Sequence, residues 1–377
     1  MLVPFNKPYM SGRELHYIAQ AHAAGKLTCD GEFAKRDHAW LEKSIGCKKA
    51  LLTPSCTAAL EMAAILCDIH PGDEIIMPSF TFVSTANAFV LRGGIPVFVD
   101  VRSDTLNIDE KKIESAITAK TKAICVVHYA GVGCEMDAIM DIARRHSLFV
   151  IEDAAQGILS KFKNTPLGSM GHLAAVSFHE TKNIQCGEGG ALLINDSQFI
   201  KRAEIIREKG TNRSQFFRGE IDKYSWVDVG SSYLPSEITA AFLFAQLEES
   251  ENITQKRIDI WNTYHDAFEI LERAGEVRRP FIPKHCQHNG HIYYLLLSDL
   301  EQRTKFIDFL KSQGVNSIFH YVSLHKSIAG EKYAKIFNGT KNTDMASECL
   351  VRLPLWMGVE QYQAKIIDLA HKALKIN

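Results

Sequence analysis

Short apolar runs alternate with stretches of helical spacing along the N-terminal part of the chain. Five runs have the length and residue types of buried strands: 50–52, 74–77, 97–99, 123–127 and 148–152. Between them, apolar residues recur every three or four positions over 57–67, 85–91, 109–117 and 136–145. Strands that alternate with helices predict an α/β fold around a mainly parallel sheet.

The pattern changes after residue 153. Two more strands are predicted at 174–178 and 191–194, and a long helical stretch at 236–271. Residues 209–233 are rich in glycine, serine, arginine and aromatic residues without periodicity, which is typical of a functional loop or an interface. A smaller α+β unit is predicted from these elements: strand 291–297, helix 302–313, strand 316–321 and helix 361–374.

Three parts of the chain are therefore expected. Residues 1–235 form a large α/β domain that includes the N-terminal segment, 236–275 a connecting helical region, and 276–377 a small C-terminal α+β domain. At roughly 150 residues per domain, the 377 residues agree with this division.

Charge and composition argue against several classes of function. The 43 Lys and Arg nearly balance the 44 Asp and Glu, so the chain has no general attraction to nucleic acid or to an anionic membrane. The sequence shows no signal-like start and no apolar run of membrane-spanning length, and its nine cysteines include no CxxC pair. We therefore expect a cytoplasmic protein with reduced thiols, small-molecule substrates and no metal site.

Three segments at predicted strand ends carry candidate chemistry, since ligands of open α/β sheets bind outside the carboxyl ends of the strands. The first, Thr-Pro-Ser-Cys-Thr-Ala-Ala at 53–59, leaves backbone N–H groups free at a helix N-terminus. Such a terminus suits a phosphate, and simple helix capping by Ser55 or Thr57 is the alternative.

The other two segments carry an acid and a lysine. A predicted strand runs into Glu152 and Asp153 and then small residues, so a carboxylate there can face a flat ligand; a solvated loop acid is the alternative. Lys182 lies in a turn between two apolar runs, ahead of the glycine-rich 187–190. Desolvation in such a turn lowers the pKa of the amine toward nucleophilic competence, and an ordinary exposed lysine is the alternative.

A phosphate site, a carboxylate and a desolvated lysine together suit one ligand. Pyridoxal phosphate carries a phosphate, a ring that a carboxylate keeps protonated, and an aldehyde that reacts with an amine. An aromatic side chain should cover the ring face. Phe80 or Phe82 is placed to do so, although packing in the core is the commoner fate of a phenylalanine.

At these residues the chain resembles the sugar-nucleotide aminotransferases that use pyridoxal phosphate, a branch of the aspartate aminotransferase fold (fold type I). The resemblance extends nearly from end to end. Its sharpest motifs are EDAAQ at 152–156, SFHETKN at 177–183 and GEGG at 187–190. Further matches at 25–31, 51–58, 209–219 and 229–234 narrow it to enzymes that aminate C4 of a dTDP-linked sugar.

The resemblance implies a role for individual residues. Lys182 binds the cofactor covalently and moves the proton, Asp153 pairs with the ring nitrogen, and Gln156 lies at the ring hydroxyl. Phe82, ahead of Phe80, stacks on the ring. The implied phosphate contacts are Cys56, Thr57 and Ser177, and Ser232 is implied to reach the cofactor of the partner subunit. The implied sugar-nucleotide contacts are Asp30, Gly31, Arg213, Arg218, His320 and Tyr321.

The resemblance also implies a reaction with L-glutamate as the amino donor. Glutamate leaves as 2-oxoglutarate, and its amino group passes to C4 of dTDP-4-keto-6-deoxy-D-glucose. The implied product is dTDP-4-amino-4,6-dideoxy-D-galactose, used for a surface polysaccharide of the enterobacterial common antigen type. The family further implies a homodimer or a dimer of dimers, in which the loop at 210–233 reaches the partner's cofactor.

Four alternatives remain open at this stage. The enzyme could act on another nucleotide keto-sugar or give the opposite stereochemistry at C4, and a non-catalytic member would keep only the fold. A dehydratase of the same family would carry histidine in place of Lys182. A dinucleotide-binding oxidoreductase is disfavoured, because the glycine pattern that starts at Gly131 has Met136 where its third glycine should be.

Overall fold

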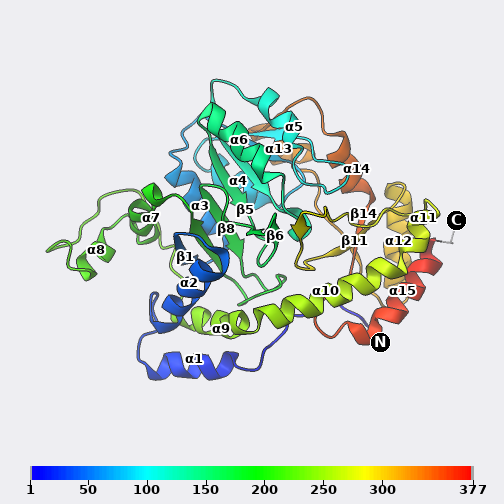
Figure 1. Ribbon diagram of the computed structural model, residues 1–377, viewed down its shortest axis with the longest axis horizontal. Coiled ribbons are helices and arrows are strands. Elements are labelled where there is room, and N and C mark those ends of the chain that lie inside the picture. The colour runs from blue at the N-terminus through cyan, green and yellow to red at the C-terminus, as the bar shows by residue number, and fades with distance from the viewer. Residues whose placement is uncertain (1, 375–377) are drawn as a thin grey trace.

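A sheet of eight strands forms the centre of the larger part of the molecule (Figure 1). The structure is a computed structural model and describes residues 2–374. The strands follow the spatial order β1 (Lys49–Thr53), β9 (Gly190–Ile194), β8 (Leu173–Ser177), β5 (Phe149–Asp153), β4 (Thr121–Val127), β2 (Glu74–Pro78), β3 (Ile95–Val99) and β13 (Lys335–Ile336).

All neighbouring strands pair in parallel except around β9, which runs antiparallel to both β1 and β8. The predicted α/β fold with a mainly parallel sheet is confirmed. The expected strands at 174–178 and 191–194 are therefore an antiparallel pair, and the turn between them carries Lys182 at the edge where β5 also ends.

Helices cover both faces of this sheet (Figure 1). They are α1 (Glu14–Ala23), α2 (Glu32–Ile45), α3 (Cys56–Leu66), α4 (Val83–Val90), α5 (Glu110–Ile113), α6 (Met136–His146), α7 (Ile200–Arg207) and α9 (Glu237–Glu248). Because successive strand residues point to opposite faces, Ile75 and Met77 of β2 pack with α3 and α4, whereas Ile76 packs with α5 and α6.

The helices α1 and α2 are not marked by the apolar pattern of the sequence, although they cover one end of the sheet. Both pack against α9, and the cluster that they share includes Tyr17, Phe33 and Phe244. No side chain next to α2 in the sequence caps its first turn. The carboxylate of Glu237 on α9 accepts the backbone N–H groups there instead, so a distant segment completes this helix.

The C-terminal part is built on a three-stranded antiparallel sheet. Its elements are β11 (Tyr293–Leu296), β14 (Leu350–Leu353), β12 (Ile318–Phe319), α11 (Glu269–Arg273), α12 (Leu300–Ser312), α14 (Lys341–Cys349) and α15 (Glu360–Leu374), whereas α13 (Ile328–Tyr333) leads into β13 of the central sheet. A small sheet of β10 (Cys286–Gln287), β6 (Lys161–Phe162) and β7 (Thr165–Pro166) joins this part to the larger one.

The long helix α10 (Ser250–Ala267) connects the two parts (Figure 1). Ile253 packs in a cluster of the central sheet, and Ile260 packs in the C-terminal cluster. The N-terminal residue Val3 also packs in the C-terminal cluster, where it bridges to Val315. The division at 235 and 275 remains a prediction. None of the helices within residues 2–374 is long and apolar enough to cross a membrane.

Several predicted elements differ in extent. The helix expected at 109–117 is the short α5 followed by a 3-10 turn at Glu114–Ala116. The strand expected at 316–321 is limited to β12, because the chain leaves the sheet and Tyr321 adopts a left-handed backbone with φ of 51°. The loop at 209–233 contains one short helix, α8 (Arg213–Phe217).

Replacing Glu237 with alanine should destabilise the protein strongly. The change leaves the buried N–H groups of Gly31, Phe33 and Ala34 without their acceptor. We expect the free energy of unfolding to fall by about 2–3 kcal/mol, measured by denaturant titration. The exposed Glu251→Ala on α10 is the matched control. Equal stability of the two variants would contradict this role for Glu237.

Candidate functional site

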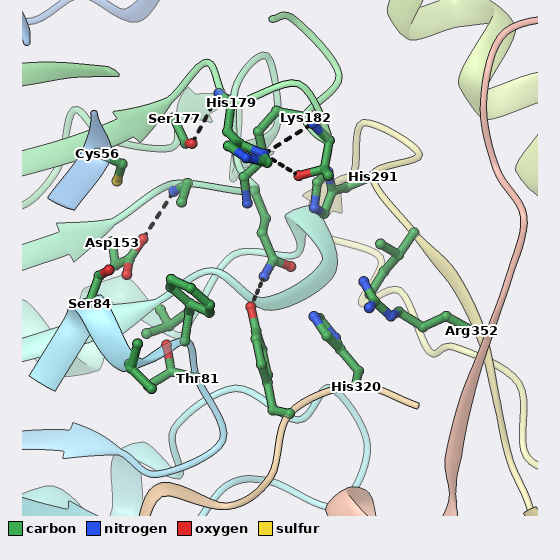
Figure 2. Close-up of a pocket in the computed structure, with 18 of the residues that line it drawn as sticks. Cys56, Thr81, Ser84, Asp153, Ser177, His179, Lys182, His291, His320 and Arg352 are labelled. Atoms are coloured by element: carbon green, nitrogen blue, oxygen red, sulfur yellow. Dashed lines mark hydrogen bonds between the residues drawn. The ribbon is translucent and has the colours of Figure 1, made fainter. Parts of the chain in front are cut away.

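A cavity of about 910 Å³ lies where the carboxyl ends of β4, β5 and β8 meet the C-terminal part (Figure 2). Many residues implied by the sequence line it: Cys56, Thr57, Phe82, Asp153, Gln156, Ser177, Lys182, His320 and Tyr321. The C-terminal part contributes the segments around 291, 318–324 and 352, and of these only His320 and Tyr321 are implied by the sequence.

One end of the cavity is suited to an anion. Ser55 caps α3, since its Oγ accepts the Ala58 N–H at 3.1 Å. Within residues 2–374 the N–H groups of Cys56 and Thr57 have no acceptor, so helix capping and a free donor pair occur together. Gly190 permits this arrangement, because a Cβ there would lie 2.4 Å from the Cys56 nitrogen.

The carboxylate of Asp153 occupies another wall. Its Oδ2 accepts the Thr85 hydroxyl at 2.6 Å, and its Oδ1 accepts the Ala155 N–H at 3.1 Å. Thr85 in turn lies 2.8 Å from the hydroxyl of Thr81. The alternative of a solvated loop acid does not hold, because Asp153 is only 5% exposed. The sequence gives no signal for this contact, because Thr85 is an ordinary threonine within a predicted helix.

Glu152, the residue before Asp153 on β5, points to the opposite face of the sheet, where it is fully buried. It accepts hydrogen bonds from the imidazole of His128 and from the backbone N–H groups of Gly168, Met170 and Gly171. Burial raises the pKa of Glu152, but these hydrogen bonds outweigh it and leave that pKa below its ordinary value. Glu152 is therefore an ionised anchor for the end of β5.

Gln156 connects two segments that border the cavity. Its Oε1 accepts the Ala130 N–H at 2.7 Å, and its Nε2 donates to the Tyr321 hydroxyl at 2.8 Å. The Tyr321 ring stacks on His320 with centroids 3.7 Å apart, and Nδ1 of His320 lies 2.7 Å from the hydroxyl of Tyr129. The side chains of the 320–321 turn are thereby fixed against the sheet.

Lys182 lies in the turn between β8 and β9 and lines the cavity. Burial lowers the pKa of its amine and the guanidinium of Arg352 lowers it further, while Cys56 and Asp153 act in the opposite direction. The desolvated lysine expected from the sequence is the one observed here. Within the described chain its Nζ has no hydrogen-bond partner, so the amine is available for reaction.

A group of basic residues faces Asp153 across the cavity (Figure 2). His291 and Arg352 belong to it and had not been identified from the sequence. Burial lowers the pKa of both side chains, and neighbouring cations lower that of His291 further. The guanidinium of Arg352 lies over the ring of Phe5 at 4.8 Å. A basic residue inside the apolar run of β14 was the one signal that could have marked Arg352.

Some implied contacts lie elsewhere in this chain. Asp30 pairs with Arg207, both carboxylate oxygens lying 2.9 Å from Nη1, and the N–H of Gly31 donates to Glu237. The guanidinium of Arg213 lies over the ring of Phe217, and that of Arg218 pairs with the carboxylates of Glu204 and Glu220. Ser232 forms a β-bridge with Glu208. None of these five implied residues lines the cavity within residues 2–374, and their roles toward a substrate or a partner subunit stay predictions.

The residues present fit pyridoxal phosphate. The free N–H groups of Cys56 and Thr57, with Ser177 nearby, suit a phosphate, Asp153 suits a ring nitrogen, and Lys182 suits an aldehyde. Phe82 is 58% exposed and lines the cavity, whereas Phe80 is buried against Tyr129.

Metal ligands do not cluster in residues 2–374: no group of three or more His, Cys, Asp or Glu side chains there could hold an ion. His320 and His325, the two histidines of the 319–325 segment, have different partners. His320 contacts Tyr129, whereas His325 lies 2.6 Å from the hydroxyl of Ser79 and 3.1 Å from Asp344.

Residues 8–369 match the model of the DegT/DnrJ/EryC1/StrS aminotransferase family. The chain belongs to this family. The match confirms the expected fold type I architecture, the aminotransferase class of enzyme and pyridoxal phosphate as its cofactor. The dinucleotide-binding alternative is thereby excluded.

One curated protein and two solved structures are similar to this chain over 86% or more of its length. The spore coat polysaccharide biosynthesis protein SpsC of Bacillus subtilis is 32% identical over 330 residues, 86% of this chain and 84% of SpsC. A DegT DnrJ EryC1 StrS aminotransferase structure from Brucella abortus is 29% identical with a TM-score of 0.87, covering 96% of this chain and 95% of that one. The putative sugar aminotransferase Spr1654 from Streptococcus pneumoniae, in its PMP form, shares the fold at 23% identity and a TM-score of 0.92, covering 99% of both chains.

Glu152→Gln should destabilise this aminotransferase in a pH-dependent way. The glutamine side chain places an NH2 group opposite N–H groups that donate hydrogen bonds to the carboxylate of Glu152. We expect this to lower the free energy of unfolding by about 1–3 kcal/mol near neutral pH. The folded-state pKa of Glu152 is lowered, so its contribution is present above the unfolded pKa and is lost as the pH falls through the folded one. The stability gap between wild type and variant should therefore narrow in acid. A gap that is constant or widens in acid, in denaturant titrations at several pH values, would contradict this.

Proposed function

We propose that the protein transfers the amino group of L-glutamate to C4 of dTDP-4-keto-6-deoxy-D-glucose, giving dTDP-4-amino-4,6-dideoxy-D-galactose and 2-oxoglutarate. The main support for this proposal is that the desolvated Lys182, the buried Asp153 and the N-terminus of α3 line one cavity. The sugar class is supported by the names of two relatives, SpsC for spore coat polysaccharide biosynthesis and Spr1654 as a putative sugar aminotransferase. The precise sugar rests on the motifs at 25–31, 51–58, 209–219 and 229–234.

Lys182 is suited to moving the proton that amino transfer requires. Bound pyridoxal phosphate supplies a protonated ring that withdraws electrons from the carbon next to the transferred nitrogen. As a neutral amine, Lys182 accepts a proton from one carbon, and as an ammonium it returns that proton to another. Burial, by lowering the pKa of Lys182, brings the two forms closer in energy at neutral pH. Asp153, fixed by Thr85, holds a proton at the ring nitrogen.

The group of basic residues that faces Asp153 suits both substrates of this reaction. Glutamate carries two carboxylates and a nucleotide sugar carries a diphosphate, so both are anions that must enter the same cavity in turn. Arg352 lines the cavity and can pair with a carboxylate through its guanidinium. His320 and Tyr321 stand on the same side for contacts with a sugar hydroxyl.

The proposed enzyme is a homodimer, or a dimer of dimers, in the cytoplasm. The 209–233 loop exposes aromatic side chains that a monomer rarely displays together. Trp226 is 80% exposed and Phe217 is 67% exposed, and the segment around α8 projects from the body of the chain (Figure 1). A second copy of the chain is the proposed occupant, with Ser232, Arg213 and Arg218 close to the partner's cavity.

Lys182→Ala should abolish amino transfer and leave the fold intact. The purified wild type should show a cofactor absorbance band that glutamate converts to the aminated form, and the band should return when the 4-keto sugar is added. The variant should show neither change, while the exposed Lys311→Ala behaves as wild type. Near-wild-type turnover by Lys182→Ala would refute the assignment. Return of the band with a different keto-sugar, or formation of the other C4 epimer, would replace the proposed substrate.

Loop variants should complement Lys182→Ala if the active sites lie between subunits. Arg213→Glu in one subunit and Lys182→Ala in the other leave one intact site per mixed dimer. Co-expression of the two inactive variants should therefore restore about one quarter of wild-type activity, because random pairing makes half of the dimers mixed. Co-expression that restores no activity, or a monomer in analytical ultracentrifugation, would contradict the shared site.

A further inference from the structure

The imidazole of His291 stands in the cavity in a defined tautomer. Its Nδ1 lies 2.9 Å from Oδ1 of Asn183. The orientation of that amide is fixed independently, because Nδ2 of Asn183 donates to the carbonyl of Asn289 at 2.8 Å. Oδ1 is therefore the acceptor, so Nδ1 of His291 carries the proton and Nε2 presents a lone pair.

The backbone around His291 is held as firmly as its ring. Arg257 on α10 donates to the carbonyl of Gly290 at 3.2 Å and to that of His291 at 2.7 Å. Asn289 donates to the carbonyls of Gln156 and Ile158 at 2.9 and 2.8 Å. Since these groups are buried, the ring of His291 has little freedom to turn away from the cavity.

Two side chains that line the cavity each have a nitrogen without a hydrogen-bond partner among the described residues. Neither Nε2 of His291 nor Nζ of Lys182 has a hydrogen-bond partner within residues 2–374, so these two atoms are not hydrogen-bonded to each other in the structure. The two side chains line one cavity, and the Lys182 charge acts on His291. Asn183, which fixes the ring, is the sequence neighbour of Lys182, so one backbone segment sets the position of both groups.

We infer that His291 is a positioning residue for Lys182: when the lysine amine turns toward the ring, Nε2 of His291 accepts a hydrogen bond from it and directs the amine toward the reacting carbon. The inference rests on the proposed role of Lys182 in moving the proton. The ring stays neutral, since burial and the charges of Lys182, Arg257 and Arg352 all lower the pKa of His291. It therefore acts as an acceptor throughout and takes no proton itself.

Imidazole ¹⁵N NMR on the cofactor-free protein tests the contact without any turnover. His291 should show a protonated Nδ1 and an unprotonated Nε2 at neutral pH. Replacing Lys182 with methionine removes the donor, so the Nε2 resonance should move toward the position of a free lone pair, whereas Lys311→Met should leave it unchanged. A protonated Nε2, or an Nε2 resonance that ignores Lys182→Met, would overturn the inference.

The glutamate half-reaction, followed by cofactor absorbance, provides the second readout. His291→Phe removes the acceptor and should slow the step by about 10- to 100-fold, the loss of one hydrogen bond to a charged group. His291→Gln, whose Oε1 replaces the acceptor, should recover most of that rate. The control His265→Phe, which keeps the stack on Trp261, should react at the wild-type rate.

The outcomes separate the inference from the proposed function. Wild type that does not react with glutamate refutes the function. Wild type that reacts while His291→Phe stays within twofold of it refutes the positioning role alone. Equal losses in His291→Phe and His291→Gln also refute it, because a purely structural ring would be missed equally in both. The NMR comparison of wild type with Lys182→Met tests the contact even if the His291 variants do not fold.

Discussion

The buried carboxylate of Glu152 is the interaction on which the site depends. It joins three separate pieces of backbone, namely the end of β5, the segment after β4 through His128, and the turn at 168–171 that leads into β8. Each of these pieces continues directly into the cavity. An ion buried this deeply is tolerated because its hydrogen bonds satisfy it, and any shift of these strand ends would break them.

The sheet and the C-terminal part contribute opposite charges to the cavity. Asp153 comes from β5, whereas Arg352 and His320 come from strands or turns of the C-terminal sheet, and His291 precedes it. Desolvation lowers the pKa of Lys182, His291 and Arg352 together. Burial keeps the lysine amine of such a cavity suited to reaction, and Arg352 is the cation beside it that suits an anionic ligand.

Buried amides connect these two halves. Asn289 ties the loop after Asp153 to the C-terminal part, and Asn183 ties the turn of Lys182 to the same segment. Gly131 lies against this junction, since a Cβ there would meet Oδ1 of Asn289 at 2.2 Å. These buried hydrogen bonds hold the segments that carry Asp153, Lys182 and His291 in fixed positions relative to one another, which suits a reaction whose proton must travel between fixed atoms.

The sequence by itself determined the groups whose chemistry is local. The strand–acid and strand–lysine junctions at Asp153 and Lys182, the cap at Ser55 and the alternating strands all follow from residue type and spacing, because turns and strand ends are short-range structures. Tertiary structure alone decided the rest. It paired β9 antiparallel, completed α2 with Glu237, removed Phe80 into the core and brought His291 and Arg352 to the sheet. Each of these depends on contacts between residues far apart in the chain, and no local pattern of apolar and polar positions records them.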